Sequence, residues 1–170
     1  MSPTCPARVR CSDTADPTFE RLDEETDLRR RAQMLDEALE ILTRAWSGQP
    51  FSYAGQFFRV RDVTMSLKPV QQPRIPIWIG GQWPRRGPVT RMLRWDGFCP
   101  YKTGPGEPWQ DLTPDDVRAI RAAADGRSGG GSFDISVGGR RRRADWDADR
   151  AHISSIARAG GGVVDRMGTD

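Results

Sequence analysis

Residues 74–84 read RIPIWIGGQWP, and this stretch decides how the rest of the chain is interpreted. Residues 75–79 form a nearly continuous apolar run, the pattern of a strand that is buried on both faces in a parallel sheet. Gly80 and Gly81 follow the run. A glycine pair in this place is either turn chemistry at a strand exit or a point where the backbone must approach a ligand closely.

Downstream of the glycines, helix and strand patterns alternate. We expect a short helix at 89–95, a strand at 95–100, a strand at 133–137, a helix at 147–159 and a strand remnant at 163–164. Thr113 followed by Pro114 and two aspartates is a strong helix start, and that helix is predicted to reach Ala124 and to stop at Gly126. Such alternation predicts an α/β fold with a parallel sheet and outer helices.

Upstream, the pattern differs. Residues 1–16 show no period, and we expect them to be disordered or poorly packed. Residues 19–46 carry leucines and alanines at helical spacing, which predicts a long helix that Gly48 ends. Residues 51–60 predict a hairpin with Gly55 at positive φ, residues 63–67 a further short strand, and the proline-rich residues 68–76 an extended connection.

The composition of the chain limits the classes of function that it can have. The chain has 170 residues, 36% of them hydrophobic, with 18 glycines and 13 prolines, so we start from one domain with a thin core. A net charge of +3 does not by itself indicate nucleic acid. The three cysteines, Cys5, Cys11 and Cys99, include no C-x-x-C pair, which argues against a disulfide framework or a metal site. Without an apolar run long enough for a bilayer or a signal peptide, we expect a cytoplasmic protein with no membrane partner.

Four segments together resemble the luciferase-like monooxygenases, a family of flavin-dependent oxidoreductases. They are RRRAQMLDEALEILTRAWSGQPFSYAGQFFRV at 29–60, KPVQQPRIPIWIGGQWP at 68–84, RMLRWDGFCP at 91–100 and FDISVGG at 133–139. The order LDE, LEIL, WSG, PIWIGG and WDG is specific, and the resemblance runs from about residue 19 to residue 160.

The resemblance implies a TIM (β/α)8 barrel that binds FMN or a deazaflavin coenzyme of the F420 type at its C-terminal mouth. Such barrels need at least ~200 residues, so the chain resembles roughly the C-terminal half of one. We therefore expect a partial barrel over 17–170 that carries the long helix and the small hairpin at its start, with 1–16 unmatched.

The end of the chain departs from the family, in which the last segment resembles AGATWWIEW. Here the chain reads ARAGGGVVDRMGTD. Synonymous codons exist for residues 163–170 that give Trp-Trp-Ile-Glu-Trp-Val-Pro one base later, so our hypothesis is a frameshift within 162–170. The nucleotide sequence decides it.

The resemblance also assigns cofactor-binding residues. Gly80 and Gly81 are placed against the flavin phosphate, where backbone N–H groups can reach an anion, and Gln82 and Pro84 shape the same loop. Lys102 either neutralises the phosphate or is a solvated lysine. Trp83 either covers the pocket or packs.

Other reactive residues have plainer interpretations. Asp96 caps a loop. Cys99 is a buried structural thiol near the mouth, with a reactive thiol as the alternative, and His152 is a surface or packed histidine, with a catalytic role as the alternative. Trp46, Trp95 and Trp146 are packing residues. The arginine run at 140–143 is a solvated loop, with nucleic-acid or phosphate contact as the alternative.

The leading hypothesis is an oxidoreductase that acts on a small organic substrate with FMN or a deazaflavin and is inactive as a truncated chain, with no catalytic residue identified. One alternative is a non-catalytic fragment that pairs with a second half or forms a homodimer. Another is a basic binding protein that uses residues 140–143.

Overall fold

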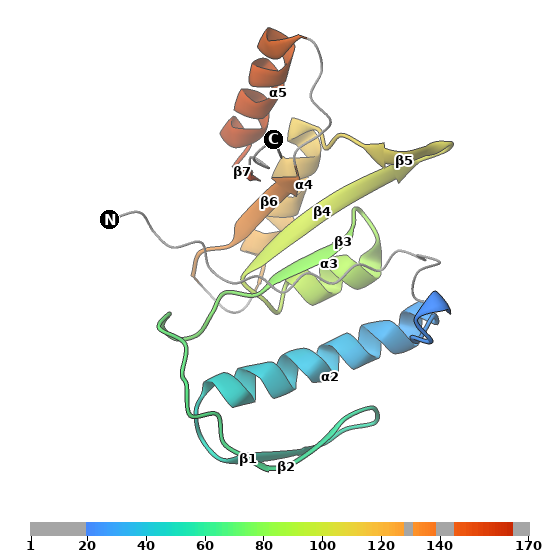
Figure 1. Cartoon of the computed structure of the whole chain (residues 1–170). Coiled ribbons are helices and arrows are strands. Elements are labelled where there is room, and N and C mark those ends of the chain that lie inside the picture. The colour runs from blue at the N-terminus through green and yellow to red at the C-terminus, as the bar shows by residue number, and fades with distance from the viewer. Residues whose placement is uncertain (1–19, 128–130, 139–144, 165–170) are drawn as a thin grey trace. The chain divides into compact units, whose positions relative to one another are not determined.

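A computed structural model describes residues 20–127, 131–138 and 145–164. The chain forms two compact units that meet in sequence at residues 75 and 76, where the sequence suggested one domain. The first unit holds helix α2 and a hairpin, and the second holds the parallel sheet with its helices. Figure 1 shows these elements in chain order.

Helix α2 (Leu28–Trp46) forms most of the first unit. Its N-cap is Asp27, whose carboxylate accepts hydrogen bonds from the N–H groups of Arg29 and Arg30 at 2.9 and 2.8 Å. The helix therefore begins later than the predicted residue 19, and Asp23 before it has a positive φ that a continuous helix excludes. Gly48 ends the helix at φ +65°, as predicted.

Strands β1 (Phe51–Ala54) and β2 (Arg59–Val63) form the antiparallel hairpin that the sequence predicted. Gly55 does not take the positive φ expected of it, and the positive-φ residue is Asp62 in β2. A Cβ at residue 55 would overlap the carboxylate of Glu37 on α2, so any larger residue there would have to displace that side chain. The separate strand predicted at 63–67 is also wrong, since Val63 is the last residue of β2 and the following residues are irregular.

The second unit is built on a sheet of order β3-β4-β6-β7, in which all three pairings are parallel. Its strands are, in order, β3 (Trp78–Gln82), β4 (Gly97–Gly104), β6 (Asp134–Gly138) and β7 (Gly162–Val164). Neighbours in the sheet are also neighbours in chain order, apart from β5 (Glu107–Gln110), which pairs antiparallel with β4. The sequence did not predict β5.

Helices separate the parallel strands. They are α3 (Arg86–Met92), α4 (Pro114–Asp125) and α5 (Trp146–Arg158), which contact β3, β6 and β7 respectively. The core holds β-branched and aromatic strand residues with one face of each helix. Its largest fully buried members are Ile77, Ile79, Met92, Phe98, Val117, Ile120, Ile135 and Ile156. The predicted mixed α/β arrangement is thus confirmed, and the boundaries of the predicted strands and helices in this unit are displaced by at most four residues.

Two termini in this unit follow the sequence closely. Thr113 and Asp116 form a capping box at the start of α4, with Pro114 as the first helical residue. Asp145 caps α5 through its carboxylate. Within the described ranges, none of the helices combines the length and the apolarity needed to cross a bilayer.

Candidate functional site: the carboxyl ends of β3 and β4

The parallel register brings most of the predicted cofactor residues to one edge of the sheet. Gln82, the last residue of β3, lies opposite Tyr101 of β4, and the Trp83 N–H donates to the Tyr101 carbonyl at 2.8 Å. Lys102 is the next residue of β4. The ends of the two strands therefore carry Gln82, Pro84 and Lys102 together, and this edge is called the rim below.

Gly81 lies inside β3 and is buried. A Cβ built on it would overlap the ring of Pro88 in α3, and it would come within 3.4 Å of the Phe98 ring. The missing side chain therefore lets α3 pack directly on the strand. This contact gives Gly81 a packing function that the sequence alone did not indicate.

Gly80 and Gln82 alternate with Gly81, so they belong to the opposite face of the sheet from α3. Both are half-buried. The Gln82 amide donates to the Thr103 hydroxyl at 2.6 Å, across to β4. This hydrogen bond joins the two strand ends on the face that α3 does not cover.

Lys102 is paired with Asp116 of α4. Its ammonium donates to both carboxylate oxygens, at 3.1 and 2.9 Å, and the two side chains are 24% and 15% exposed. The Trp83 indole donates to the same carboxylate at 3.2 Å. Lys102 is therefore ion-paired and partly buried, and the Trp83 indole has a polar partner. A phosphate contact by Lys102 and a covering role for Trp83 stay predictions.

The electrostatics of Asp116 follow from these partners. Burial by itself raises the pKa of Asp116, but the hydrogen bonds from Lys102 and Thr113 and the charge of Lys102 together bring that pKa below its ordinary value. The carboxylate is consequently ionised at neutral pH. It neutralises the Lys102 charge at the rim.

Several candidate residues lie elsewhere. Asp96 accepts a hydrogen bond from the Ile77 N–H at 2.7 Å, at the amino ends of the strands, so it fastens β4 to β3 far from the rim. Cys99 in β4 is half-buried, not buried as predicted. His152 lies in α5. Trp146 is 59% exposed, so the prediction that it is a packing residue is wrong. Residues 140–143 and 165–170 lie outside the described ranges, as do Cys5 and Cys11.

Three features of the rim were not predicted from the sequence. Tyr101 and Trp109 form an edge-to-face pair across the β4–β5 hairpin, with ring centroids 5.4 Å apart. Arg85 and Arg86, directly after Pro84, are exposed. Asp116 was recognised only as a helix-start residue, and no local signal points to its partners, which are 14 and 33 residues away.

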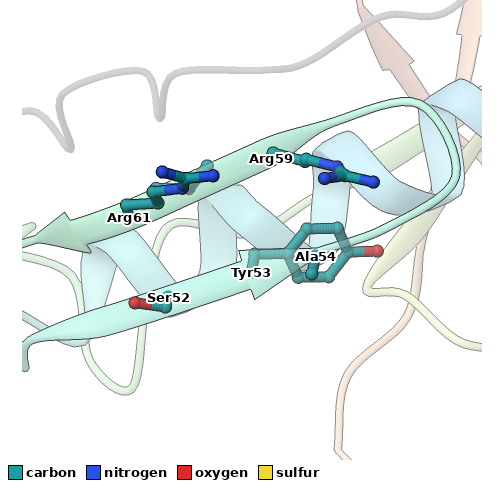
Figure 2. A pocket seen from close by; sticks show the side chains of 6 residues that line it. Ser52, Tyr53, Ala54, Arg59 and Arg61 are labelled. Atoms are coloured by element: carbon teal, nitrogen blue, oxygen red, sulfur yellow. The ribbon is translucent and has the colours of Figure 1, made fainter.

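Two hollows lie away from the rim. One, of about 290 Å³, lies at the amino end of β6, and its arginines donate to main-chain carbonyls: Arg121 to Phe133 at 2.6 Å and Arg127 to Gly131 at 2.7 Å. The other, of about 280 Å³, lies on the hairpin of the first unit and is lined by Ser52, Tyr53, Ala54, Arg59, Val60 and Arg61. Figure 2 shows Arg59 and Arg61 side by side along β2. Neither hollow contains a predicted site residue.

Comparison with known proteins supplies the family. Residues 14–153 match the model of the luciferase-like monooxygenases. Similar curated proteins include an F420-dependent glucose-6-phosphate dehydrogenase of Microbacterium testaceum, 37% identical over 54 residues, and an FMNH2-dependent dimethylsulfone monooxygenase of Pseudomonas putida, 30% identical over 99 residues. These matches cover 32% and 58% of the chain and 16% and 26% of those proteins.

A solved structure agrees in fold. The monooxygenase RslO1 from Streptomyces bottropensis superposes with a TM-score of 0.57 at 18% identity. The match covers 89% of this chain and 47% of that one, so the chain spans about half the length of the solved relative. With residues 14–153 matched by the family model, the chain belongs to the luciferase-like monooxygenase family.

Proposed function

We propose that residues 17–170 form the C-terminal half of a (β/α)8 barrel from a flavin- or F420-dependent oxidoreductase. Four parallel strands lie in chain order, and a helix follows each of the first three. This alternation of strand and helix is the repeat of such a barrel. The match also covers 47% of the solved monooxygenase, which is the share expected of half a barrel. In this proposal the chain has no turnover without the other strands of the barrel.

The rim is proposed to hold the phosphate end of the cofactor. Ligands of barrel enzymes bind at the carboxyl ends of strands, where Gln82, Pro84 and Lys102 lie, and Gly80 is two residues before the end of β3. Gly80 offers main-chain groups without a side chain, and Lys102 carries three N–H donors, of which its bonds to Asp116 use at most two. Gly81 acts indirectly, by seating α3 behind the rim.

Exposed positive charge supports a phosphate at this edge. Arg85 and Arg86 follow Pro84 immediately, and guanidinium groups bind phosphate oxygens through paired N–H donors. FMN and F420 both carry phosphate, and the curated relatives are named for one or the other. When bound, such a cofactor supplies the redox chemistry. The residues of this chain bind and orient it; the small organic substrate is not specified by them.

The observation that carries the proposal is that Gln82 and Lys102 lie at the same edge of the sheet, since Gln82 lies opposite Tyr101 and Lys102 follows Tyr101 in β4. Its test is a fluorescence titration of FMN and of F420 with the purified chain. We expect one of them to be quenched, with weaker binding in Lys102→Ala and in Gly80→Val, whose side chain would fill the uncovered face. Gly87→Ala is the control, because a Cβ at Gly87 meets no neighbour. Absence of quenching by both cofactors contradicts the proposal.

A non-catalytic chain that pairs with a second chain is the other candidate. One observation favours it: β3 and β7 are the end strands of the described sheet, and unpaired strand edges are templates for association. A homodimer in size-exclusion chromatography with light scattering, together with no binding of either cofactor, would support it over the first proposal.

A further inference from the structure

The carboxylate of Asp116 receives hydrogen bonds from three separate segments. Oδ1 accepts from the Trp83 indole at 3.2 Å and from the Lys102 ammonium at 3.1 Å. Oδ2 accepts from Lys102 at 2.9 Å and from the N–H and the hydroxyl of Thr113, both at 2.8 Å. Its donors therefore come from the loop after β3, from β4 and from the N-cap of α4.

Helix capping explains only part of this arrangement. A capping box requires the third helical residue to accept from the N-cap N–H, and the Thr113 bonds satisfy that requirement. The bonds to Trp83 and Lys102 add nothing to the cap. They connect the start of α4 to the ends of both strands that form the rim.

The neighbouring aspartate shows that position in the helix does not impose the arrangement. Asp115 lies in the same turn, carries the same charge and is 91% exposed. It pairs with Arg118 on the helix surface. Two adjacent carboxylates thus share the helix terminus, and only one of them contacts the rim.

We propose that Asp116 is a positioning residue that holds the Lys102 ammonium and the Trp83 indole at the rim. The ligand in this inference, the phosphate of FMN or F420, rests on the proposed function. The placement of Trp83 by Asp116 does not depend on any ligand. The ion pair of Asp116 and Lys102 has no net charge. Asp116 therefore adds no positive charge to the rim, but it fixes the direction of the Lys102 N–H that is not used in the pair. Loss of Asp116 is then expected to weaken phosphate binding even though it removes a negative charge.

The experiment compares Asp116→Ala and Asp116→Asn with the matched variant Asp115→Asn. The first readout is the indole N–H resonance of Trp83 in the 15N-labelled chain, assigned with Trp83→Phe. It is expected to shift and to exchange faster with solvent in Asp116→Ala, to move less in Asp116→Asn, whose amide oxygen still accepts, and to stay in place in Asp115→Asn. Thr113→Ala, which removes only the cap hydroxyl, is expected to lower stability and leave this resonance nearly unchanged.

The second readout is the affinity for FMN and F420. Asp116→Ala is expected to weaken binding about tenfold, the loss that follows when one charge-assisted hydrogen bond is misplaced. Lys102→Ala should give a similar loss, and the double variant little more than either single one, since both remove the same interaction. Equal or tighter binding in Asp116→Ala overturns the inference, as does an unmoved Trp83 resonance.

The two proposals fail separately. If the unaltered chain binds neither cofactor, the proposed function is contradicted, and the Trp83 resonance still decides whether Asp116 positions the rim. If the unaltered chain binds and Asp116→Asn behaves like Asp115→Asn in both readouts, the proposed function stands and the inference is overturned. Should Asp116→Ala not fold, Asp116→Asn carries the comparison alone.

Discussion

Two carboxylates in this chain each organise a neighbouring segment. Asp116 joins the strand ends, and Glu37 on α2 holds the hairpin turn, where it accepts from the N–H groups of Gln56, Phe57 and Phe58 at 2.7, 3.0 and 3.0 Å. Desolvation raises the pKa of Glu37, but the three backbone hydrogen bonds outweigh it and bring the pKa below its ordinary value. The same bonds that define the turn therefore favour the charged side chain.

Glu37→Gln is expected to destabilise the first unit, because a neutral amide is a weaker acceptor for three N–H groups. The effect depends on pH in a defined direction. Because the folded pKa of Glu37 lies below its unfolded pKa, the contribution of Glu37 to stability is complete above the unfolded pKa. It is lost as the pH falls through the folded pKa.

The measurement is thermal unfolding at neutral pH and at acid pH, with Glu40→Gln as the control. Glu40 lies on the same helix and pairs with Arg44 at the surface, where ion pairs contribute little. The difference between the two variants should be large at pH 7 and should shrink as Glu37 becomes protonated. A constant difference across that range would show that Glu37 acts through packing.

Gly81 gives the second prediction at this scale. Gly81→Ala forces its Cβ into Pro88, so we expect a loss of about 1–3 kcal/mol in the free energy of unfolding. Gly87→Ala in α3 meets no neighbouring atom, and it should be neutral or gain up to about 1 kcal/mol from helix propensity. Urea unfolding measures both, and equal stabilities would refute the packing role of Gly81.

At the scale of elements, side chains at the ends of α4 fix its position at both ends of the sheet. Asp116 works at the rim, and Arg127 works beyond the last turn, where it donates to the carbonyls of Trp95 at 3.0 Å and Gly131 at 2.7 Å. The Arg127 guanidinium also lies 4.8 Å from the centroid of the Phe133 ring. The helix is thereby connected to segments that its own backbone cannot reach.

Arg127→Ala is expected to cost about 1.5–3 kcal/mol, the usual loss for hydrogen bonds from a charged donor to partly buried carbonyls. Arg118→Ala is the comparison on the same helix. Its guanidinium pairs with Asp115 in solvent, so the change should stay below about 1 kcal/mol. Chemical denaturation distinguishes the two, and similar losses would show that the Arg127 bonds are not net stabilising.

At the scale of the whole molecule, the chain divides into two units that meet in sequence at residues 75 and 76. Residues 64–75 lead from β2 to this boundary. This connection is irregular in the structure, and Leu67 and Val70 in it are 81% and 94% exposed. An exposed irregular segment with apolar side chains is accessible to proteases that cut beside them.

Brief digestion with thermolysin is therefore expected to cut first near Leu67 or Val70, among the sites within the described residues. Mass spectrometry of the early fragments identifies the bonds. Leu67→Asp/Val70→Asp should slow these cuts and leave the unfolding midpoint unchanged, since both side chains are exposed. First cuts inside α2 or α4 would contradict the division into two units.

Local chemistry explains how much could be predicted from the sequence. Apolar spacing predicted α2, and Thr113 with the aspartates after it predicted the start of α4. Both patterns involve residues within a few positions of each other. The run before Gly80 identified a buried parallel strand for the same reason. Strand β5 was not predicted because it is short, directly follows Gly106 and is defined by its pairing with β4.

The sequence by itself determined the types and order of the parallel strands and helices, and through its motifs the family resemblance. Tertiary structure alone decided that Gly81 seats Pro88, that Glu37 occupies the turn at Gly55, and that Lys102 pairs with Asp116 while Trp83 donates to the same carboxylate. The reason is physical: helix and strand formation depend on neighbours in sequence, whereas these contacts depend on sheet register and helix packing, which bring together residues far apart in the chain.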